Sequence, residues 1–311
     1  MRVLFFGMDG RFSVPPLLQL LGSRAEVAAI VVPAPRGSDE SALPRLLPKS
    51  TMLSADYLPL LEADFNPNII HLGWQRQIPV WEVGRLAGDN ARAMLAGLQP
   101  DLVAVACFPR RFPAWLLGLP RFGCLNLHPS LLPAYRGPEP LFWIARNDER
   151  VTGVTLHLLA DGLDSGDIIA QRRFERGDGT SGAELESRCA AEGAALLVET
   201  IGQLLRGAPL PRRPQDEAEA SYYPAPTAGD LTIPAYWPAR RAFNFARGAE
   251  GWPLTLEIGD ACFRLRAVKS FAANQTLERP VVLLGDEVWV QFTPGVLRAR
   301  IWPPPPDNKA A

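Results

Sequence analysis

The sequence predicts an α/β domain with a Rossmann-like, mostly parallel sheet, followed by a small β-rich C-terminal domain. Three observations support this fold class. Short apolar runs alternate with helical segments over residues 1–205, a proline-rich charged segment follows, and short strands with Gly-Asp turns fill the remainder. The chain has 311 residues, more than one domain usually contains. We therefore expect an α/β domain at residues 1–208, a linker at 209–220, a β-barrel-like domain at 221–302 and a flexible tail at 303–311.

The first elements form a βαβ unit, the building block of a parallel sheet. Residues 2–6 and 27–32 are continuous apolar runs, which are typical of strands buried on both faces. Between them, Ser13 and two prolines begin a helix, because proline is tolerated in a first helical turn. Prolines interrupt the region that follows, and there we expect only short strands at residues 69–72 and 78–80.

Two further apolar runs supply inner strands of the sheet. They cover residues 101–107 and 122–128, and the second run ends abruptly at Pro129. Two more strands flank a turn at residues 160–166, and Ser181 caps a long helix rich in alanine, leucine and glutamate. The other expected elements are helices at 85–98, 139–146 and 238–247, and strands at 152–159, 167–174, 253–258, 261–270, 281–284, 287–292 and 296–301.

Composition and charge argue against several classes of protein. No apolar run approaches the ~18 residues of a membrane span, and the N-terminus is not a signal peptide, so we expect a cytoplasmic protein with no membrane partner. The net charge of −1 argues against a dedicated nucleic-acid-binding domain, although it is compatible with a local basic patch, and no DNA partner is expected. The four cysteines and three histidines have no metal-ligand spacing, so no metal site is expected. The turn at residues 7–10 lacks the GxGxxG spacing of dinucleotide-binding proteins.

Asn126 and His128 are the first candidates for a functional site. They are two residues apart on an expected inner strand, so their side chains project from one face. They also lie at the carboxyl end of that strand, where open α/β sheets bind ligands. A lone histidine beside an apolar run is equally consistent with a buried structural residue. The neighbouring carboxamide and the turn fixed by Pro129 favour a functional role.

Three motifs make the sequence similar to a known family. Residues 126–137 read NLHPSLLPAYRG, residues 152–157 read TGVTLH, and residues 162–167 read GLDSGD. Together they closely resemble the 10-formyltetrahydrofolate-dependent formyltransferases. That family includes methionyl-tRNA formyltransferase, glycinamide ribonucleotide formyltransferase, sugar-amine N-formyltransferases and the hydrolase domain of formyltetrahydrofolate dehydrogenase. The resemblance covers about residues 1–205, which would form the catalytic domain, and is fainter beyond them.

The resemblance implies an N-formyltransferase that uses 10-formyltetrahydrofolate as co-substrate and no metal. It assigns the catalytic roles to Asn126, His128 and Asp164, and the folate pocket to the loop after the 101–107 strand and to the aspartate loop. Many relatives have glycine at the position of Pro109, so backbone recognition of the pterin is expected to differ here. Relatives also bend sharply at Leu132–Pro133, which predicts a cis peptide bond. The cofactor candidates are Phe108, Pro109, Arg111, Phe112, Asp161 and Gly162, and the substrate-side candidates are Met8, Asp9, Ser130, Arg136, Gly137 and His157.

The chemistry explains why these residue types are needed. When a neutral amine attacks the formyl carbon, negative charge develops on oxygen and positive charge on nitrogen. A carboxamide N–H from Asn126 would stabilise the oxygen. His128, as a cation, would assist and pass a proton to the departing folate, while Asp164 would favour the charged imidazole and take the amine proton through water. For His157, a role in packing or in the substrate wall is favoured over direct catalysis.

The acceptor is less constrained by the sequence. Methionyl-tRNA formyltransferases typically carry a basic loop after the second strand, whereas here Asp39 and Glu40 offset Arg36. The sequence therefore favours a small amine such as a nucleotide-linked amino sugar, with aminoacyl-tRNA as the other acceptor. A 10-formyltetrahydrofolate hydrolase and a weakly active folate-binding module are the alternative functions. The candidate cations for tRNA are Arg36, Arg45, Lys49, Arg212, Arg213, Arg240 and Arg241.

Overall fold

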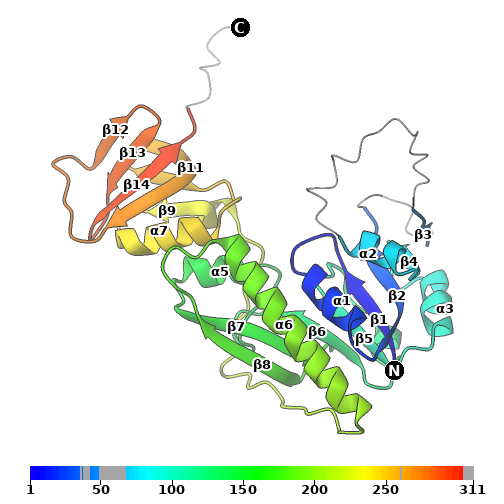
Figure 1. Cartoon of the computed structure of the whole chain (residues 1–311). Coiled ribbons are helices and arrows are strands. Elements are labelled where there is room, and N and C mark those ends of the chain that lie inside the picture. The colour runs from blue at the N-terminus through cyan, green and yellow to red at the C-terminus, as the bar shows by residue number, and fades with distance from the viewer. Residues whose placement is uncertain (36, 38–42, 49–67, 260, 304–311) are drawn as a thin grey trace, which may run out of the picture. The chain divides into compact units, whose positions relative to one another are not determined.

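An eight-stranded sheet carries the N-terminal part of the chain (Figure 1). The structure is a computed structural model that describes residues 1–35, 37, 43–48, 68–259 and 261–303. The strand order is β3-β4-β2-β1-β5-β6-β7-β8, in which β4 to β6 pair in parallel while β3–β4 and β6–β7 are antiparallel. The predicted mostly parallel sheet is confirmed. Its strands are β1 (Arg2–Gly7), β2 (Glu26–Pro33), β3 (Arg45–Leu46), β4 (Val80–Val83), β5 (Leu102–Ala106), β6 (Cys124–His128), β7 (Val151–Leu158) and β8 (Ile168–Glu175).

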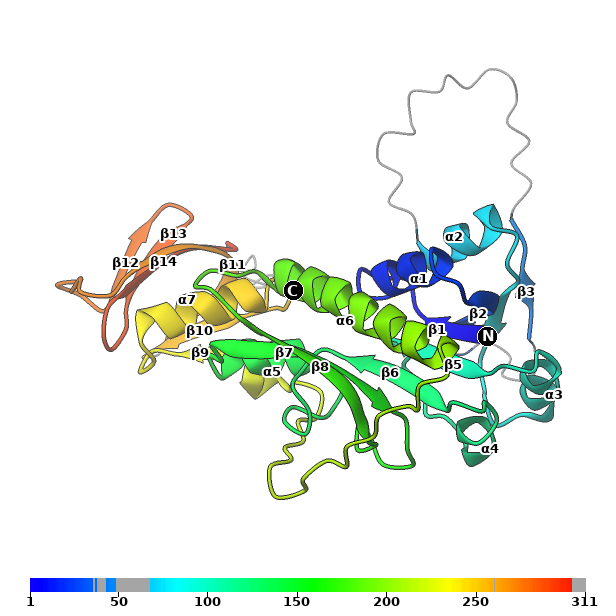
Figure 2. The same ribbon diagram turned by 60° about the horizontal axis from the view of Figure 1, so that its bottom comes forward.

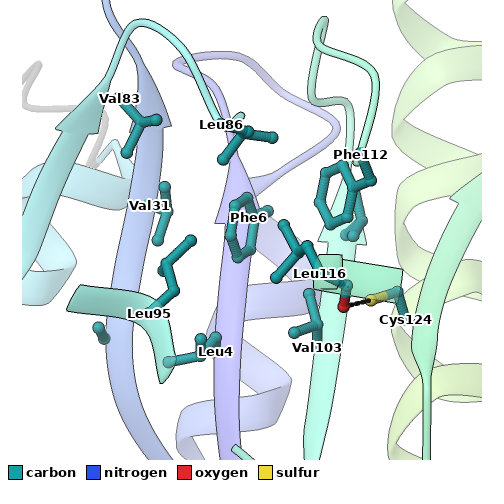
Figure 3. Packing of buried hydrophobic residues seen from close by; sticks show 12 residues of the cluster. Leu4, Phe6, Val31, Val83, Leu86, Leu95, Val103, Phe112, Leu116 and Cys124 are labelled. Carbon is teal, nitrogen blue, oxygen red and sulfur yellow. Dashed lines mark hydrogen bonds between the residues drawn. The ribbon is translucent and has the colours of Figure 1, made fainter. Parts of the chain in front are cut away.

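Helices cover both faces of the central strands. On one face, Leu4 and Phe6 of β1 belong to a buried cluster that includes side chains of α3 and α4 (Figure 3). On the other face, α2 packs so closely that a Cβ on Gly73 would lie 2.6 Å from Val80 and 2.9 Å from Ile30. The helices are α1 (Val14–Leu21), α2 (Ile69–Gln75), α3 (Asp89–Gly97), α4 (Ala114–Leu117), α5 (Pro140–Arg146) and α6 (Gly182–Leu205).

The long helix α6 determines which face of β6 is available for chemistry. It runs along β6 and β7 (Figure 2), where a Cβ on Gly193 would lie 3.2 Å from both Leu127 and Val154. Neighbouring residues of a strand point to opposite faces, so Asn126 and His128 face away from α6. The helix begins with the predicted cap, because Ser181 Oγ accepts the N–H of Glu184, whose carboxylate accepts the N–H of Ser181.

The region before β5 differs from the sequence-based expectation. The strand expected at residues 69–72 is wrong, because these residues begin α2, with the side chain of Asn68 accepting the N–H of His71 at 2.9 Å. An apolar run of this length does not distinguish a strand from a buried helix. The strand expected at 78–80 lies later, as β4, and the helix expected at 85–98 is shorter, as α3.

Packing divides the chain into two compact units, each assembled from separate segments. Unit 1 comprises Met1–Arg136, Gly153–Arg172 and Ser187–Ala220, and unit 2 comprises Gly137–Thr152, Arg173–Glu186 and Ser221–Ala311. Within unit 2, the ring of Phe142 lies 5.4 Å from that of Phe245 and 5.0 Å from that of Trp252. The domain limits expected from the sequence stay a prediction, and residues 304–311 of the expected tail lie outside the described residues.

Unit 2 contains a second sheet, so the predicted β-rich C-terminal region is confirmed. Its strand order is β12-β13-β14-β11-β10-β9. The sequence missed β9 because three residues that include a proline carry no strand signal. The elements are β9 (Thr232–Pro234), β10 (Thr255–Ile258), β11 (Ala261–Ala272), β12 (Val281–Leu284), β13 (Glu287–Gln291), β14 (Val296–Ile301), α7 (Ala239–Gly248) and the short 3₁₀ helix Ala228–Leu231.

The contact between β7 and β8 leads to a stability prediction. A Cβ on Gly153 would lie 2.2 Å from the carbonyl oxygen of Arg172, so Gly153→Ala is expected to lower the free energy of unfolding by about 1–3 kcal/mol. The control is Gly202→Ala on α6, where the nearest atom lies 3.5 Å away and the change is expected to raise that free energy by about 0.5–1 kcal/mol. Urea denaturation measures both, and equal stabilities would contradict this packing.

Candidate functional site

The antiparallel pairing of β6 with β7 brings Asn126 next to His157. The two residues lie directly opposite each other in the register, so they share a face of the sheet. Asn126 Nδ2 is 3.0 Å from His157 Nε2, and His157 Nδ1 is 2.9 Å from the carbonyl oxygen of Leu158. A carbonyl only accepts, so Nδ1 carries a proton. In the neutral ring, Nε2 therefore accepts a hydrogen bond from the carboxamide of Asn126.

Asp164 reaches two imidazoles from the loop that follows β7. Its Oδ1 lies 3.7 Å from His128 Nδ1 and 3.7 Å from His157 Nε2. All three side chains are at most 8% exposed. The backbone of Asp164 has φ of 50°, in the left-handed region that residues with a side chain seldom adopt. The three residues with predicted catalytic roles therefore lie around a single buried cluster, together with His157.

His128 presents both ring nitrogens to hydrogen-bond acceptors. Nε2 lies 2.8 Å from the carbonyl oxygen of Tyr135, and Nδ1 faces the carboxylate of Asp164. Each ring nitrogen of His128 therefore has an oxygen acceptor on its side of the ring. The turn after His128 supplies the Tyr135 carbonyl and contains the predicted cis Leu132–Pro133 peptide, which is confirmed.

The two imidazoles of the cluster differ in their electrostatics. The pKa of His157 is lowered to about 4, chiefly by burial and also by the neighbouring His128, while Asp164 and the Leu158 carbonyl act in the opposite direction. His157 is therefore neutral near pH 7. This neutral state fixes the direction of the hydrogen bond, with Asn126 as donor and His157 Nε2 as acceptor.

The two loops expected to bind folate are joined by an exposed ion pair. Arg111 donates to the carbonyl of Asp161 at 2.6 Å and to its carboxylate at 2.9 Å. The two side chains are 76% and 95% exposed, so this pair adds little stability by itself. It does connect the loop after β5 with the loop that contains Asp164. Pro109 and Gly162 are exposed on these same loops.

Two of the cofactor candidates pack against the hydrophobic core. The rings of Phe108 and Phe112 lie 5.1 Å and 5.0 Å from that of Phe6 on β1. Phe112 is buried, whereas Phe108 is partly exposed. These contacts anchor the loop after β5 to the sheet, so the aromatic residues shape this loop through packing.

Several substrate-side candidates have structural partners. Ser130 is buried, and its hydroxyl donates to the carbonyl of Ala134 at 2.8 Å, which holds the turn after β6. Arg136 binds Gln215 and Glu217 of the 209–220 segment. In unit 2, a Cβ on Gly137 would lie 2.0 Å from the carbonyl oxygen of Tyr223, so the position requires glycine.

The loop after β1 holds the substrate-side candidates Met8 and Asp9, and it is organised by Ser13, a residue not predicted to belong to the site. Asp9 is exposed, and the N–H of Met8 donates to Ser13 Oγ at 3.2 Å. Ser13 is fully buried, and its hydroxyl donates to the carbonyl of Ala106 at 2.7 Å. It thereby joins this loop to the end of β5. A serine before a helix reads as a cap in a sequence, which hides such a role.

Other side-chain chemistry is limited in the part of the chain that the structure describes. Within it, no three His, Cys, Asp or Glu side chains converge as metal ligands. None of the helices in the described ranges has the length and hydropathy to cross a bilayer. Cys124 is buried, and burial raises the pKa of its thiol to about 12, so it stays protonated.

Sequence comparison finds formyltransferases. The Formyl transferase family model matches residues 60–201. A methionyl-tRNA formyltransferase from Acidobacterium capsulatum is 35% identical over 257 residues, which cover 81% of this chain and 75% of that protein. A methionyl-tRNA formyltransferase from Acetivibrio thermocellus is 29% identical over 301 residues, which cover 96% of this chain and 84% of that protein.

Solved structures share the fold at low sequence identity. An N-formyltransferase from Helicobacter canadensis, in complex with folinic acid and dTDP-3-aminofucose, has a TM-score of 0.67 at 16% identity, covering 97% of this chain and 100% of that chain. HypX from Aquifex aeolicus, in complex with tetrahydrofolic acid, has a TM-score of 0.59 at 17% identity, covering 96% of this chain and 43% of that chain. These structures share the fold, and the sequence identity to the methionyl-tRNA formyltransferases shows that the chain belongs to the formyltransferase family and is a one-carbon transferase.

Proposed function

We propose that this protein transfers the formyl group of 10-formyltetrahydrofolate to a primary amine, with Asn126, His128 and Asp164 as its catalytic residues. The observation that carries the proposal is the convergence of these side chains at the carboxyl end of β6. Folate ligands in the formyltransferase and HypX structures support the class of donor. The exposed Arg111–Asp161 pair supports a donor pocket between the two loops that it joins.

Asn126 stabilises the charge that develops on the formyl oxygen. The amine nitrogen attacks the formyl carbon and produces a tetrahedral adduct with a negative oxygen and a positive nitrogen. One carboxamide N–H of Asn126 is donated to His157 Nε2, and the second N–H is the donor for the oxygen. Because His157 is neutral, it holds the carboxamide with its NH₂ group, and not its oxygen, at the site.

His128 and Asp164 move the proton. The ammonium nitrogen of the adduct must lose one proton, and N10 of tetrahydrofolate must gain one as the bond between the formyl carbon and N10 breaks. Asp164 accepts the amine proton through water, and His128 passes a proton to N10. Asp164 Oδ1 lies 3.7 Å from His128 Nδ1, so the proton that Asp164 accepted then passes to His128 and restores both groups for the next turnover. The proton count balances without any external acid.

We propose methionyl-tRNA as the acceptor, because relatives at 35% identity that match over most of their length are methionyl-tRNA formyltransferases. The cations expected from the sequence give little support. Arg36 and Lys49 lie outside the described residues. Arg213 donates to Gln171, Arg240 pairs with Asp148, and Arg241 donates to a backbone carbonyl.

A second set of cations in unit 2 supports a nucleic-acid acceptor. Arg264 and Arg266 are exposed on β11, whereas the neighbouring Arg300 on β14 pairs with Asp286 at 3.6 Å. Two tryptophans accompany this set, because Arg266 lies 5.2 Å from the ring of Trp302, and Arg298 lies 3.9 Å from that of Trp289. Arginine next to aromatic rings suits phosphates and unpaired bases. A nucleotide-linked amino sugar is the second candidate, favoured by the ligand of the Helicobacter canadensis enzyme.

The catalytic roles predict the effect of three substitutions. Asn126→Ala, His128→Ala and Asp164→Ala are each expected to lower kcat by about 10²–10³-fold, because each removes a group that acts on the transition state. The control is His71→Ala on α2, which is expected to keep full activity. Formyl transfer is followed by mass of the product, and formate is measured without acceptor. Steady formate release in place of transfer would favour the hydrolase, and full activity of His128→Ala would refute the mechanism.

The neutral state of His157 predicts a pH dependence of stability. Its pKa is lowered from 6.5 to about 4, so the unfolded chain binds this proton more tightly than the folded protein. The free energy of unfolding therefore has its full contribution from neutral His157 above about pH 6.5. It falls by about 3 kcal/mol as the pH falls toward about 4. His157→Gln keeps an acceptor for Asn126 but does not titrate, so it should lack this component. Urea denaturation across that pH range checks the difference, and identical curves would count against a neutral buried His157.

The acceptor proposal predicts an effect of charge reversal on β11. The double variant Arg264→Glu, Arg266→Glu is expected to raise KM for methionyl-tRNA by about tenfold or more and to reduce the salt dependence of binding, with kcat unchanged. Arg24→Glu, an exposed arginine of unit 1, is the matched control. Efficient formylation of a nucleotide-linked amino sugar, with none of methionyl-tRNA, would select the second candidate.

A further inference from the structure

We propose that Gln215 is a positioning residue that holds the carboxylate of Asp164 between His128 and His157, and that Arg136 in turn holds Gln215. The inference rests on the proposed function for its kinetic readout. Gln215 lies in the segment 209–220, whose proline-rich and charged sequence is typical of a linker. The structure gives this segment contacts that a passive linker does not need.

The side-chain amide of Gln215 binds the backbone on both sides of Ser165. Its Nε2 donates to the carbonyl oxygens of Asp164 and Gly166, each at 2.7 Å. Both hydrogens of the NH₂ group are therefore used on the loop that carries the catalytic carboxylate. These bonds fix the direction of the Asp164 carbonyl, and with it the backbone from which the carboxylate extends.

The aspartate loop needs such support because its backbone is strained and tightly packed. Asp164 has φ of 50°, a conformation that costs an L-residue roughly 1 kcal/mol or more. Two residues later, a Cβ on Gly166 would lie 2.0 Å from the carbonyl oxygen of Leu158, so the loop passes directly against the end of β7. Relaxation of Asp164 toward an ordinary conformation would move its carboxylate away from the imidazoles.

Arg136 holds the other end of the Gln215 amide. Gln215 Oε1 accepts from Arg136 Nε at 3.0 Å and from Nη2 at 2.8 Å. Glu217 accepts from Nη1 at 2.9 Å and from Nη2 at 2.8 Å, in a bidentate pair. The Arg136 side chain is only 10% exposed, so its charge requires these partners. The guanidinium lowers the pKa of Glu217, which keeps that carboxylate charged.

The backbone of the segment sets the reach of Gln215. Arg213 forms an antiparallel bridge with Ile168, the first residue of β8, through hydrogen bonds of 2.8 Å and 3.0 Å. Gln215 follows two residues later and so lies beside the loop that precedes β8. The bridge, the amide and the Arg136–Glu217 pair together connect residues 213–217 to the aspartate loop.

Two substitutions with matched controls test the proposal kinetically. Gln215→Glu keeps the acceptor for Arg136 but loses both donors to the loop, and Gln203→Glu makes the same change at an exposed position on α6. Glu217→Gln weakens the hold on Arg136, and Glu219→Gln is the same change two residues further along the segment. We expect kcat to fall about 10- to 100-fold for Gln215→Glu and less for Glu217→Gln. KM for the folate donor should stay within about twofold in both, and the controls should match the wild type.

Histidine ring resonances provide a readout that does not depend on activity. The chain has three histidines, so the imidazole signals of His128 and His157 can be assigned with His71→Ala and His157→Gln. Gln215→Glu should shift both signals, in the direction produced by Asp164→Asn, whereas Gln203→Glu should not. Wild-type kcat or unshifted signals in Gln215→Glu would overturn the inference. If the wild type transfers no formyl group while the signals of Gln215→Glu still shift, the proposed function fails and the positioning role stands.

Discussion

The antiparallel register between β6 and β7 is the constraint on which the candidate site depends. A slip of one residue would turn His157 toward α6 and leave Asn126 opposite an aliphatic side chain. Thr155 secures the register, because its hydroxyl donates to the carbonyl of Ser130 at 2.7 Å and accepts the N–H of Leu132 at 3.1 Å. The turn after β6 is thereby attached to β7, so backbone pairing and the Thr155 hydroxyl together keep Asn126 opposite His157.

Burial of this polar cluster is tolerable because its charges are few and paired. A carboxylate and two imidazoles removed from water carry a large desolvation cost unless opposite charges and hydrogen bonds offset it. Here the imidazole of His157 stays neutral, so it adds no second charge beside Asp164 and His128. The neutral ring still contributes, as an acceptor that orients a carboxamide. One residue type thus performs two different tasks, and the difference comes from the burial and the neighbours of each ring.

The sequence predicts what depends on local pattern and misses what depends on contacts across the chain. The shared face of Asn126 and His128 is predicted from the alternation of side chains along an apolar strand. The strands β1 and β5 are predicted from their apolar runs, and α6 from its capping residue Ser181. Asp164 lies in a turn that looks ordinary, and only the family resemblance identified it. Gln215 was missed because its partners are backbone carbonyls of a loop about fifty residues earlier. The helix α2 was mistaken for a strand because its apolar run is too short to show a period.

The interleaving of the two compact units limits how this protein can change during evolution. The ring of Phe142 packs against Phe245, and that of Trp143 packs against Tyr223. The core of unit 2 therefore needs both its 137–152 segment and its C-terminal segment, which unit 1 residues separate in the sequence. No single crossover point in the gene would transfer unit 2 intact, because residues 137–152 and 173–186 would stay behind. Exchange of a C-terminal cassette between relatives would therefore separate these aromatic partners.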